Sequence, residues 1–349
     1  MIEALWTEKY RPKELEDFYG RGEVVRLCRT YIAEKSIPHL LLVGPEGSGK
    51  KSLSLVLAKK ILGDWFTHNF KAWDASDYGG VILVKSESDW DYDERKKAEE
   101  RGIISLKDIT LSRKIGDAPY RIIFIDNAHL LNLEAQQGFR ALIEKNFNNC
   151  RFILSCSAAS RLIIPLRSRT VRIAFTPTTF DNMFKILKDI ADKERIGSKD
   201  GHLLRPSFQL IYQESNYNLS KAINLLQASA AIDASLMPNS VQEVISSVKS
   251  QNIKQMIKYV GLGNFLEARK YLSKVMYDEG LSGLDIIKQI MGEIENSNIP
   301  SKKKMQLISL CGDHEFRLIQ SQESYYQIEA LLANMMVVLV EKNQEIISY

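Results

Sequence analysis

The sequence predicts three parts: an α/β domain with helices on the faces of a parallel sheet, a small helical domain, and a C-terminal domain of helices alone. Two observations favour this fold class. In the first half of the chain, short apolar runs alternate with segments of helical periodicity. From about residue 177 onward the strand signals fade and amphipathic helical patterns replace them. We therefore expect domains over residues 1–175, 176–237 and 238–349.

The elements of the α/β domain follow from apolar runs and from the residues beside them. Residues 39–43 are predicted to form a buried strand that leads into a glycine-rich loop. The spacing of apolar residues over 53–61 predicts a helix directly after that loop. Further buried strands are expected at residues 121–126 and 151–156. The composition of residues 235–240 is typical of a linker, which places the start of the last domain there.

Composition is that of an ordinary globular protein and excludes several classes. With 45% hydrophobic and 26% charged residues, the 349-residue chain resembles neither a disordered nor a membrane protein. No apolar stretch approaches the roughly 18 residues that span a bilayer. The start lacks a secretion signal, so a cytoplasmic location is expected. The four cysteines show no metal-binding spacing, and a net charge of +4 is too small to indicate nucleic-acid binding.

The strongest motif is the loop GPEGSGK at residues 44–50, which joins the first predicted strand to a helix. Glycines in such a loop let backbone N–H groups point at phosphate oxygens, and the lysine adds a mobile positive charge. We therefore expect the chain to bind ATP or ADP. The residues assigned to the nucleotide are Gly44, Gly47, Ser48, Gly49, Lys50, Lys51, Ser52 and Asp126.

Two positions lack the residues that metal binding and hydrolysis require. Lys51 stands where a magnesium-binding serine or threonine belongs, and an ammonium has no lone pair to offer a cation. Asp126, at the end of a predicted strand, remains as the expected Mg²⁺ contact, weak or through water. Asn127 stands where a water-activating carboxylate belongs, and losing such a base costs about 10²–10⁴ in rate. We expect nucleotide binding with little or no hydrolysis.

Further motifs give the chain its resemblance to a known family. The opening WTEKYRP at residues 6–12, the segment AQQGFR at residues 135–140 with Glu144 after it, and SRT at residues 168–170 are similar to family signatures. The family is that of the replication factor C small subunits, and the chain is most similar to the archaeal type. The resemblance continues into the helical parts and covers nearly the whole chain.

The resemblance implies an AAA+ fold, in which an α/β ATPase domain and a helical lid precede a helical collar that joins subunits. It also implies a hetero-oligomeric, ATP-dependent clamp loader. Such a complex holds other small subunits and a large subunit, opens a ring-shaped sliding clamp of the PCNA type, and places it on primer-template DNA. The location implied is cytoplasmic for an archaeal protein and nuclear for a eukaryotic one.

Residue by residue, the resemblance assigns Arg169 as an arginine finger that acts in trans on the ATP of the next subunit, worth about 10³–10⁵ in rate. Two sensor positions depart from the family pattern, because Ser157 replaces an asparagine and Ser220 an arginine. Lys51 and Asn127 bring the altered positions of the chain's own site to four. The expected role is a subunit that serves hydrolysis at its neighbour more than its own.

Other interpretations stay open at the level of sequence. The chain could be an active ATPase in which Ser52 and Glu46 replace the missing groups, or an adaptor subunit of an alternative loader used in repair. His129 is a further candidate for the missing base, although a local hydrogen bond is the simpler expectation for it.

DNA binding is expected through phosphate contacts rather than through base reading. At the position of a DNA-contacting arginine of the family, this chain has Gly79. Lys85 and Lys107 are candidates to replace that contact.

Overall fold

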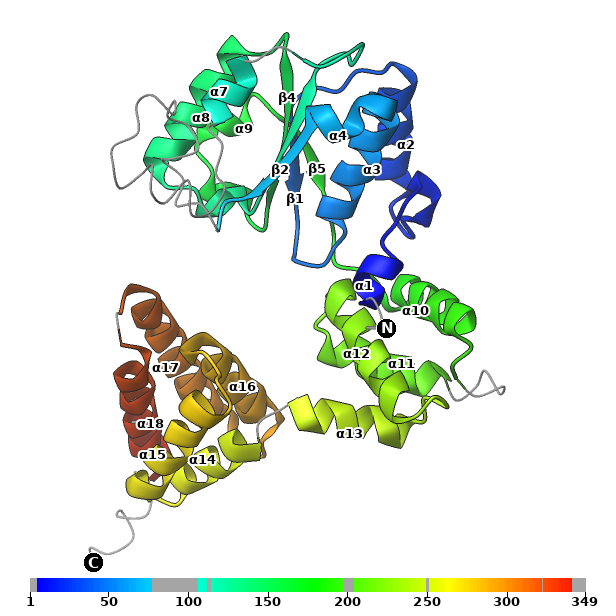
Figure 1. The fold of residues 1–349 in the computed structure, drawn as a ribbon. Coiled ribbons are helices and arrows are strands. Elements are labelled where there is room, and N and C mark those ends of the chain that lie inside the picture. The colour runs from blue at the N-terminus through cyan, green and yellow to red at the C-terminus, as the bar shows by residue number, and fades with distance from the viewer. Residues whose placement is uncertain are drawn as a thin grey trace, which may run out of the picture. The chain divides into compact units, whose positions relative to one another are not determined.

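The computed structural model describes residues 5–76, 106–111, 114–197, 204–248, 251–321 and 323–340, with the backbone alone at 106, 107, 111 and 246–248. The chain divides into two compact units, Met1–Val241 and Gln242–Tyr349, and each is described by itself (Figure 1). The division lies inside helix α13 (Pro238–Val248).

The first unit is built on a five-stranded parallel sheet with the strand order β2-β3-β4-β1-β5. Its strands are β1 (Leu40–Val43), β2 (Phe70–Asp74), β3 (Arg121–Asp126), β4 (Cys150–Cys156) and β5 (Val171–Ala174). The three central strands β1, β3 and β4 confirm those predicted from apolar runs, because strands covered on both faces carry consecutive apolar residues. The edge strands β2 and β5 escape the sequence pattern because exposed residues interrupt it.

Helices cover both faces of the sheet (Figure 1). On one face lie α2 (Gly22–Ala33), α3 (Lys50–Leu62) and α4 (Phe66–Asn69), and on the other lie α7 (Leu106–Leu111), α8 (Leu133–Lys145) and α9 (Ile164–Arg167). Successive residues of a strand point to opposite faces, so Leu40 and Leu42 of β1 join one core whereas Leu41 and Val43 join the other. Short 3-10 turns occur at Leu15–Asp17, Gly63–Trp65, Ala128–Leu130 and Ala159–Arg161.

A helical layer completes the first unit. It comprises α10 (Phe180–Glu194), α11 (Leu204–Glu214) and α12 (Leu219–Ile232), whose apolar faces bury Met183, Phe208 and Leu226. The short N-terminal helix α1 (Trp6–Lys9) joins this layer, since Trp6 is buried and its backbone N–H donates to Oε1 of Gln227 at 3.0 Å. The WTEKYRP signature therefore starts on the helical layer.

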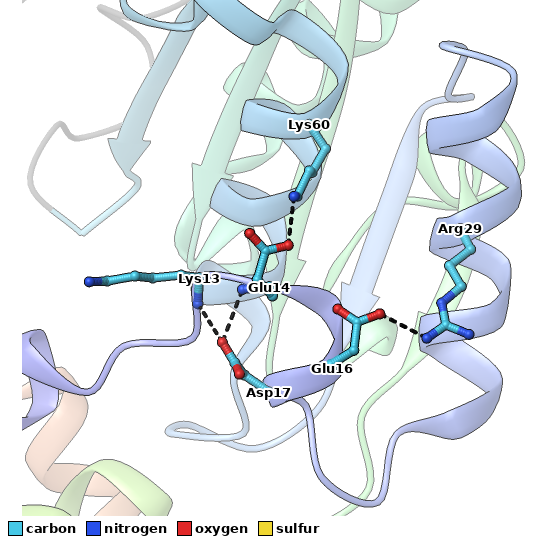
Figure 2. A network of polar contacts seen from close by, with 6 residues as sticks. All are labelled: Lys13, Glu14, Glu16, Asp17, Arg29 and Lys60. Atoms are coloured by element: carbon cyan, nitrogen blue, oxygen red, sulfur yellow. Dashed lines mark hydrogen bonds and ion pairs between the residues drawn. The ribbon is translucent and has the colours of Figure 1, made fainter. Parts of the chain in front are cut away.

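Residues 13–17 tie the start of the chain to the helices beside the sheet (Figure 2). The backbone N–H groups of Lys13 and Glu14 donate to Oδ2 of Asp17 at 2.9 and 3.0 Å, which closes a tight turn. Two ion pairs then reach the flanking helices, Glu14 to Lys60 of α3 at 2.6 Å and Glu16 to Arg29 of α2 at 2.8 Å. Exposed pairs of this kind stabilise little one by one, but together they set the path of the segment that precedes α2.

In the residues that the structure describes, the second unit contains the end of α13 followed by helices with short connections between them. They are α14 (Gln251–Gly261), α15 (Phe265–Ser273), a π-helical turn (Lys274–Asp278), α16 (Gly283–Asn296), α17 (Ser301–Gln320) and α18 (Ser324–Val340). Met256, Ile290, Leu307 and Leu331 lie in one core that all these helices share. Side-chain caps begin two of the helices: Asn264 accepts from a backbone N–H of α15, and Ser282 from one of α16.

Within the described ranges, the helices are all too short or too polar to cross a membrane. The four cysteines Cys28, Cys150, Cys156 and Cys311 are free and buried. Burial raises the pKa of the Cys28 and Cys311 thiols to about 11, so both stay protonated and unreactive at neutral pH.

Candidate functional site

The glycine-rich loop follows β1 and ends at the first turn of α3. Its glycines are required by space and by backbone conformation. A Cβ on Gly44 would lie 2.2 Å from the carbonyl oxygen of Phe175, and one on Gly47 would lie 1.9 Å from Oδ1 of Asn218. Gly47 and Gly49 also have φ values of 67° and 95°, which side chains disfavour. The loop thus leads into the N-terminus of a 13-residue helix, whose free N–H groups attract anions.

Lys50 is folded back into this loop. Its ammonium donates to the carbonyl oxygens of Gly44 at 2.8 Å and Pro45 at 2.7 Å. The side chain is buried, and burial lowers its pKa while the Asp126 carboxylate acts in the opposite direction. A positive charge therefore lies in the loop where the outer phosphates of a nucleotide would bind.

Two cavities meet at the loop. One, of about 340 Å³, is lined by Tyr10 and Arg11 of the N-terminal segment, Gly47 and Gly49 of the loop, and Ile223 of the helical layer, among others. The second, of about 360 Å³, brings together most of the predicted site residues. They are Gly47, Gly49, Lys50, Lys51, Ser52, Asp126, Asn127 and Ser220, and Glu46 lies beside them. The cavities are of the size of small-ligand sites, and their linings combine apolar and polar residues.

The turn after β3 places Asp126 and Asn127 next to two groups that the sequence motifs do not reveal. Oδ1 of Asp126 accepts a hydrogen bond from the Ser155 hydroxyl of β4. The Asn127 side-chain amide donates to both carboxylate oxygens of Asp74, at 3.1 and 3.0 Å. Both contacts join neighbouring strands, so strand order and not sequence proximity creates them.

Asp74 ends the edge strand β2 and is ionised. Burial raises the pKa of its carboxyl, but hydrogen bonds from the Ser76 hydroxyl and backbone N–H and from Asn127 outweigh burial and lower that pKa overall. Nearby Lys51 acts in the same direction. Lys51 itself is exposed, although it lines the same cavity as Asp126.

Ser157 and His129 form a pair at the end of β4. The Ser157 hydroxyl and Nε2 of His129 lie 3.2 Å apart. Nδ1 of His129 is buried and has no hydrogen-bond partner among the described residues. Burial lowers the pKa of His129, and the charges of Arg161 and Lys50 lower it further, so the ring is neutral at neutral pH.

Arg169 lies on the surface between α9 and β5. Its Nη2 is 2.6 Å from Oε1 of Glu144 at the end of α8, and its Nη1 donates to the carbonyl oxygen of Pro165 at 2.9 Å. Arg140 shares the same Glu144 oxygen at 3.6 Å. Neither Glu144 nor Pro165 lines the two cavities at the phosphate loop. The side chain is thus held apart from the chain's own nucleotide cavity.

The predicted DNA-contacting positions Gly79 and Lys85, and the side chain of Lys107, lie outside the described residues.

Known proteins resemble the chain over nearly its whole length. The model of the replication factor C C-terminal domain matches residues 248–334. Replication factor C small subunits of Methanococcus vannielii and Archaeoglobus fulgidus are 34% and 33% identical to it. These matches cover 95% and 94% of this chain and 98% and 96% of the relatives. A relative of the same name from Thermofilum pendens is 33% identical over 97% of this chain and 98% of its own length.

A solved structure of a Thermotoga maritima RuvB variant resembles the fold with a TM-score of 0.51 at 18% identity. The match covers 80% of this chain and 85% of that one, and it places the parallel sheet and its helices in the AAA+ fold. Identities above 30% across almost the entire length of the archaeal relatives identify the chain as a member of the replication factor C small subunits, clamp-loader ATPases of the archaeal type.

Proposed function

We propose that this subunit gives Arg169 to the nucleotide of a neighbouring subunit, while its own site binds ATP or ADP and hydrolyses it slowly. The observation that carries the proposal is the position of Arg169, an exposed guanidinium held by Glu144 and Pro165 away from its own phosphate loop. A planar guanidinium in that place suits the spread charge of a phosphoryl group in transfer.

The chain's own site fits a nucleotide. Loop glycines, the N-terminus of α3 and Lys50 are suited to phosphates, and the cavity beside Tyr10 and Ile223 is suited to a nucleoside. When bound, ATP supplies the phosphoryl group whose transfer drives a clamp loader. The residues of this chain hold and orient that group but offer no carboxylate at position 127 to take a proton from water.

The same site fits Mg²⁺ poorly. Asp126 is the assigned contact, and one of its oxygens is already engaged by Ser155. Lys51 places an ammonium among the lining residues, at the position where a hydroxyl ligand is needed. A positively charged ammonium repels a metal cation and has no lone pair to offer it. We assign no catalytic step to a metal at this site.

The partners that we propose are other small subunits and a large subunit, a sliding clamp of the PCNA type, and primer-template DNA. Membership of the replication factor C family supports them. In such a complex the helical unit, residues 242–349, serves as the collar that joins subunits.

The test is single-turnover ATP hydrolysis by the reconstituted complex. Arg169→Ala is compared with Arg167→Ala, which removes an exposed arginine two residues earlier. We expect the first variant to lose about 10³-fold or more at one site and the second to retain its rate. Equal rates for both variants would contradict the role of Arg169.

A second candidate function is an active ATPase in which Ser52 and Glu46 replace the missing groups. It is favoured by one observation, because both residues line the same cavity as Asp126. Ser52→Ala and Glu46→Gln in the purified full chain separate the candidates. Under this alternative each variant slows hydrolysis at saturating ATP at least tenfold. Our proposal expects the slow basal rate at saturating ATP to stay the same, because neither residue then takes part in the chemistry.

A further inference from the structure

The contact between Asn127 and Asp74 has a bearing on why this site lacks a base. Asp74 ends β2 and is the register partner of Asp126, which ends β3. Two acidic residues therefore finish adjacent strands at the same edge of the sheet. Asn127 follows Asp126, and its amide nitrogen lies within 3.1 Å of both Asp74 oxygens. The Asn127 amide therefore donates hydrogen bonds to both oxygens of the Asp74 carboxylate.

Ser76 also holds the Asp74 carboxylate. The backbone N–H and the hydroxyl of Ser76 donate to its Oδ1 at 3.0 and 2.6 Å. With three donor groups around it, the carboxylate keeps its charge and has little freedom to turn away. Any side chain at position 127 therefore lies beside a fixed negative charge.

A carboxylate at position 127 does not meet that requirement. It has no proton to donate to Asp74, and it would bring a second negative charge to the oxygens that the amide now contacts. Like charges at such a distance in a partly buried turn repel strongly. The backbone adds a second restriction, because Asn127 has φ 50°, a conformation that Asn and Asp tolerate better than longer side chains.

We propose that Asp74 is a positioning residue that holds Asn127 through its amide and makes the turn after β3 incompatible with a carboxylate at position 127. The inference rests on the proposed function, in which this subunit's own site is slow, and adds to it a second determinant on the neighbouring strand. Restoring an acid at 127 then restores the site only if Asp74 is neutralised as well.

The first test is a double-variant cycle on the thermal stability of the full chain. Asn127→Asp has the same shape as the native residue and changes only the donor to a charge. In the native background we expect it to lower Tm by about 3–6 °C. In the Asp74→Asn background the same change exchanges donor and acceptor across the contact, so we expect Tm to stay the same or rise. Equal Tm losses in both backgrounds would overturn the inference.

The second test measures the rate of ATP hydrolysis, which would not change if the contact between positions 74 and 127 were purely structural. In a Lys51→Thr background, which supplies the missing hydroxyl, Asn127→Asp is made with and without Asp74→Asn. Single-turnover hydrolysis with the chain in excess over labelled ATP is then compared. We expect the variant that also carries Asp74→Asn to hydrolyse ATP at least about tenfold faster than the variant that keeps Asp74. Equal rates for the two variants, including two rates at background, would contradict the proposed effect of Asp74 on position 127.

The two outcomes are distinguishable from a failure of the proposed function. Brisk hydrolysis by the unaltered chain would contradict the slow own site while leaving the Tm coupling between positions 74 and 127 intact. Absence of that coupling would remove the inference while leaving the role of Arg169 unaffected.

Discussion

The chain's own nucleotide site and the surface around Arg169 belong to one compact unit, but they differ in their geometry and in their reactive side chains. The own site retains its geometry, with glycines at positive φ, a buried lysine and a cavity of nucleotide size. Lys51, Asn127, Ser157 and Ser220 are the positions where we expect its chemistry to be impaired. Around Arg169, the exposed guanidinium and the residues that hold it are present. We propose on this basis that nucleotide binding and catalysis depend on separable features, and that the subunit keeps the first for itself and supplies the second to a neighbour.

The strongest challenge to this contrast is Arg169→Lys. The charge is kept, but the planar fork that reaches two phosphate oxygens is lost, so the ATPase rate of the complex should fall by about 10²–10³. Steady-state hydrolysis with clamp and primer-template DNA measures it, and Arg167→Lys is the control. If lysine supports nearly the full rate, the geometry of the finger has no part in catalysis.

Lys50→Ala tests whether the own site binds nucleotide. Removing the ammonium deletes charge-assisted hydrogen bonds to phosphate, and the affinity of the purified full chain for a fluorescent ATP analogue should fall by about 10–100-fold. Lys59→Ala removes an exposed lysine from the last turn of the same helix and should change affinity little. Similar losses for both variants would mean that the loop attracts the nucleotide by net charge and not by the position of Lys50.

Glu144→Gln addresses how Arg169 is held. Because the ion pair is exposed, its contribution is at most about 1 kcal/mol, which limits the loss of complex ATPase to about fivefold. Glu134→Gln, on the first turn of the same helix, should have no effect. A loss as large as that of Arg169→Ala would show that Glu144 takes part in the chemistry and not only in placing the guanidinium.

His129→Ala should have the smallest effect. His129 pairs with Ser157, and its pKa is lowered, so it is neutral, yet water activation is expected to require a group at position 127. We expect hydrolysis by the complex to stay within about twofold of the unaltered rate. A loss of tenfold or more would make His129 the missing base and would contradict the slow own site.

The central strands and the phosphate loop follow from the sequence because their signals are local. Strand β1 is apolar throughout, β3 and β4 each contain an uninterrupted apolar run, and the loop lies within seven consecutive residues. The edge strands β2 and β5 do not follow, since solvent on one side allows polar residues among the apolar ones. Strand order, which depends on the packing of the whole sheet, cannot be obtained from such runs.

The same reason explains which parts of the site the sequence reveals. Lys50 and Asp126 are recognised by their motifs, but Asp74 lies 53 residues from Asn127 and contacts it only because β2 runs beside β3. Ser155 reaches Asp126 in the same way from β4. The four positions that we expect to be altered are recognised from the sequence alone, whereas the contacts of such a residue, as of Asn127 with Asp74, appear only in the fold.

The most direct measurement is the ATPase rate of the reconstituted complex with Arg169→Ala and with Lys50→Ala in otherwise identical preparations. The first variant removes the guanidinium that we propose acts on the nucleotide of the neighbouring subunit, and the second removes the ammonium that we propose holds the subunit's own nucleotide. We predict that Arg169→Ala costs at least about 10³-fold at one site, while Lys50→Ala leaves most of the activity. Equal losses from the two variants would contradict the claim that this subunit acts mainly across the boundary to the next one.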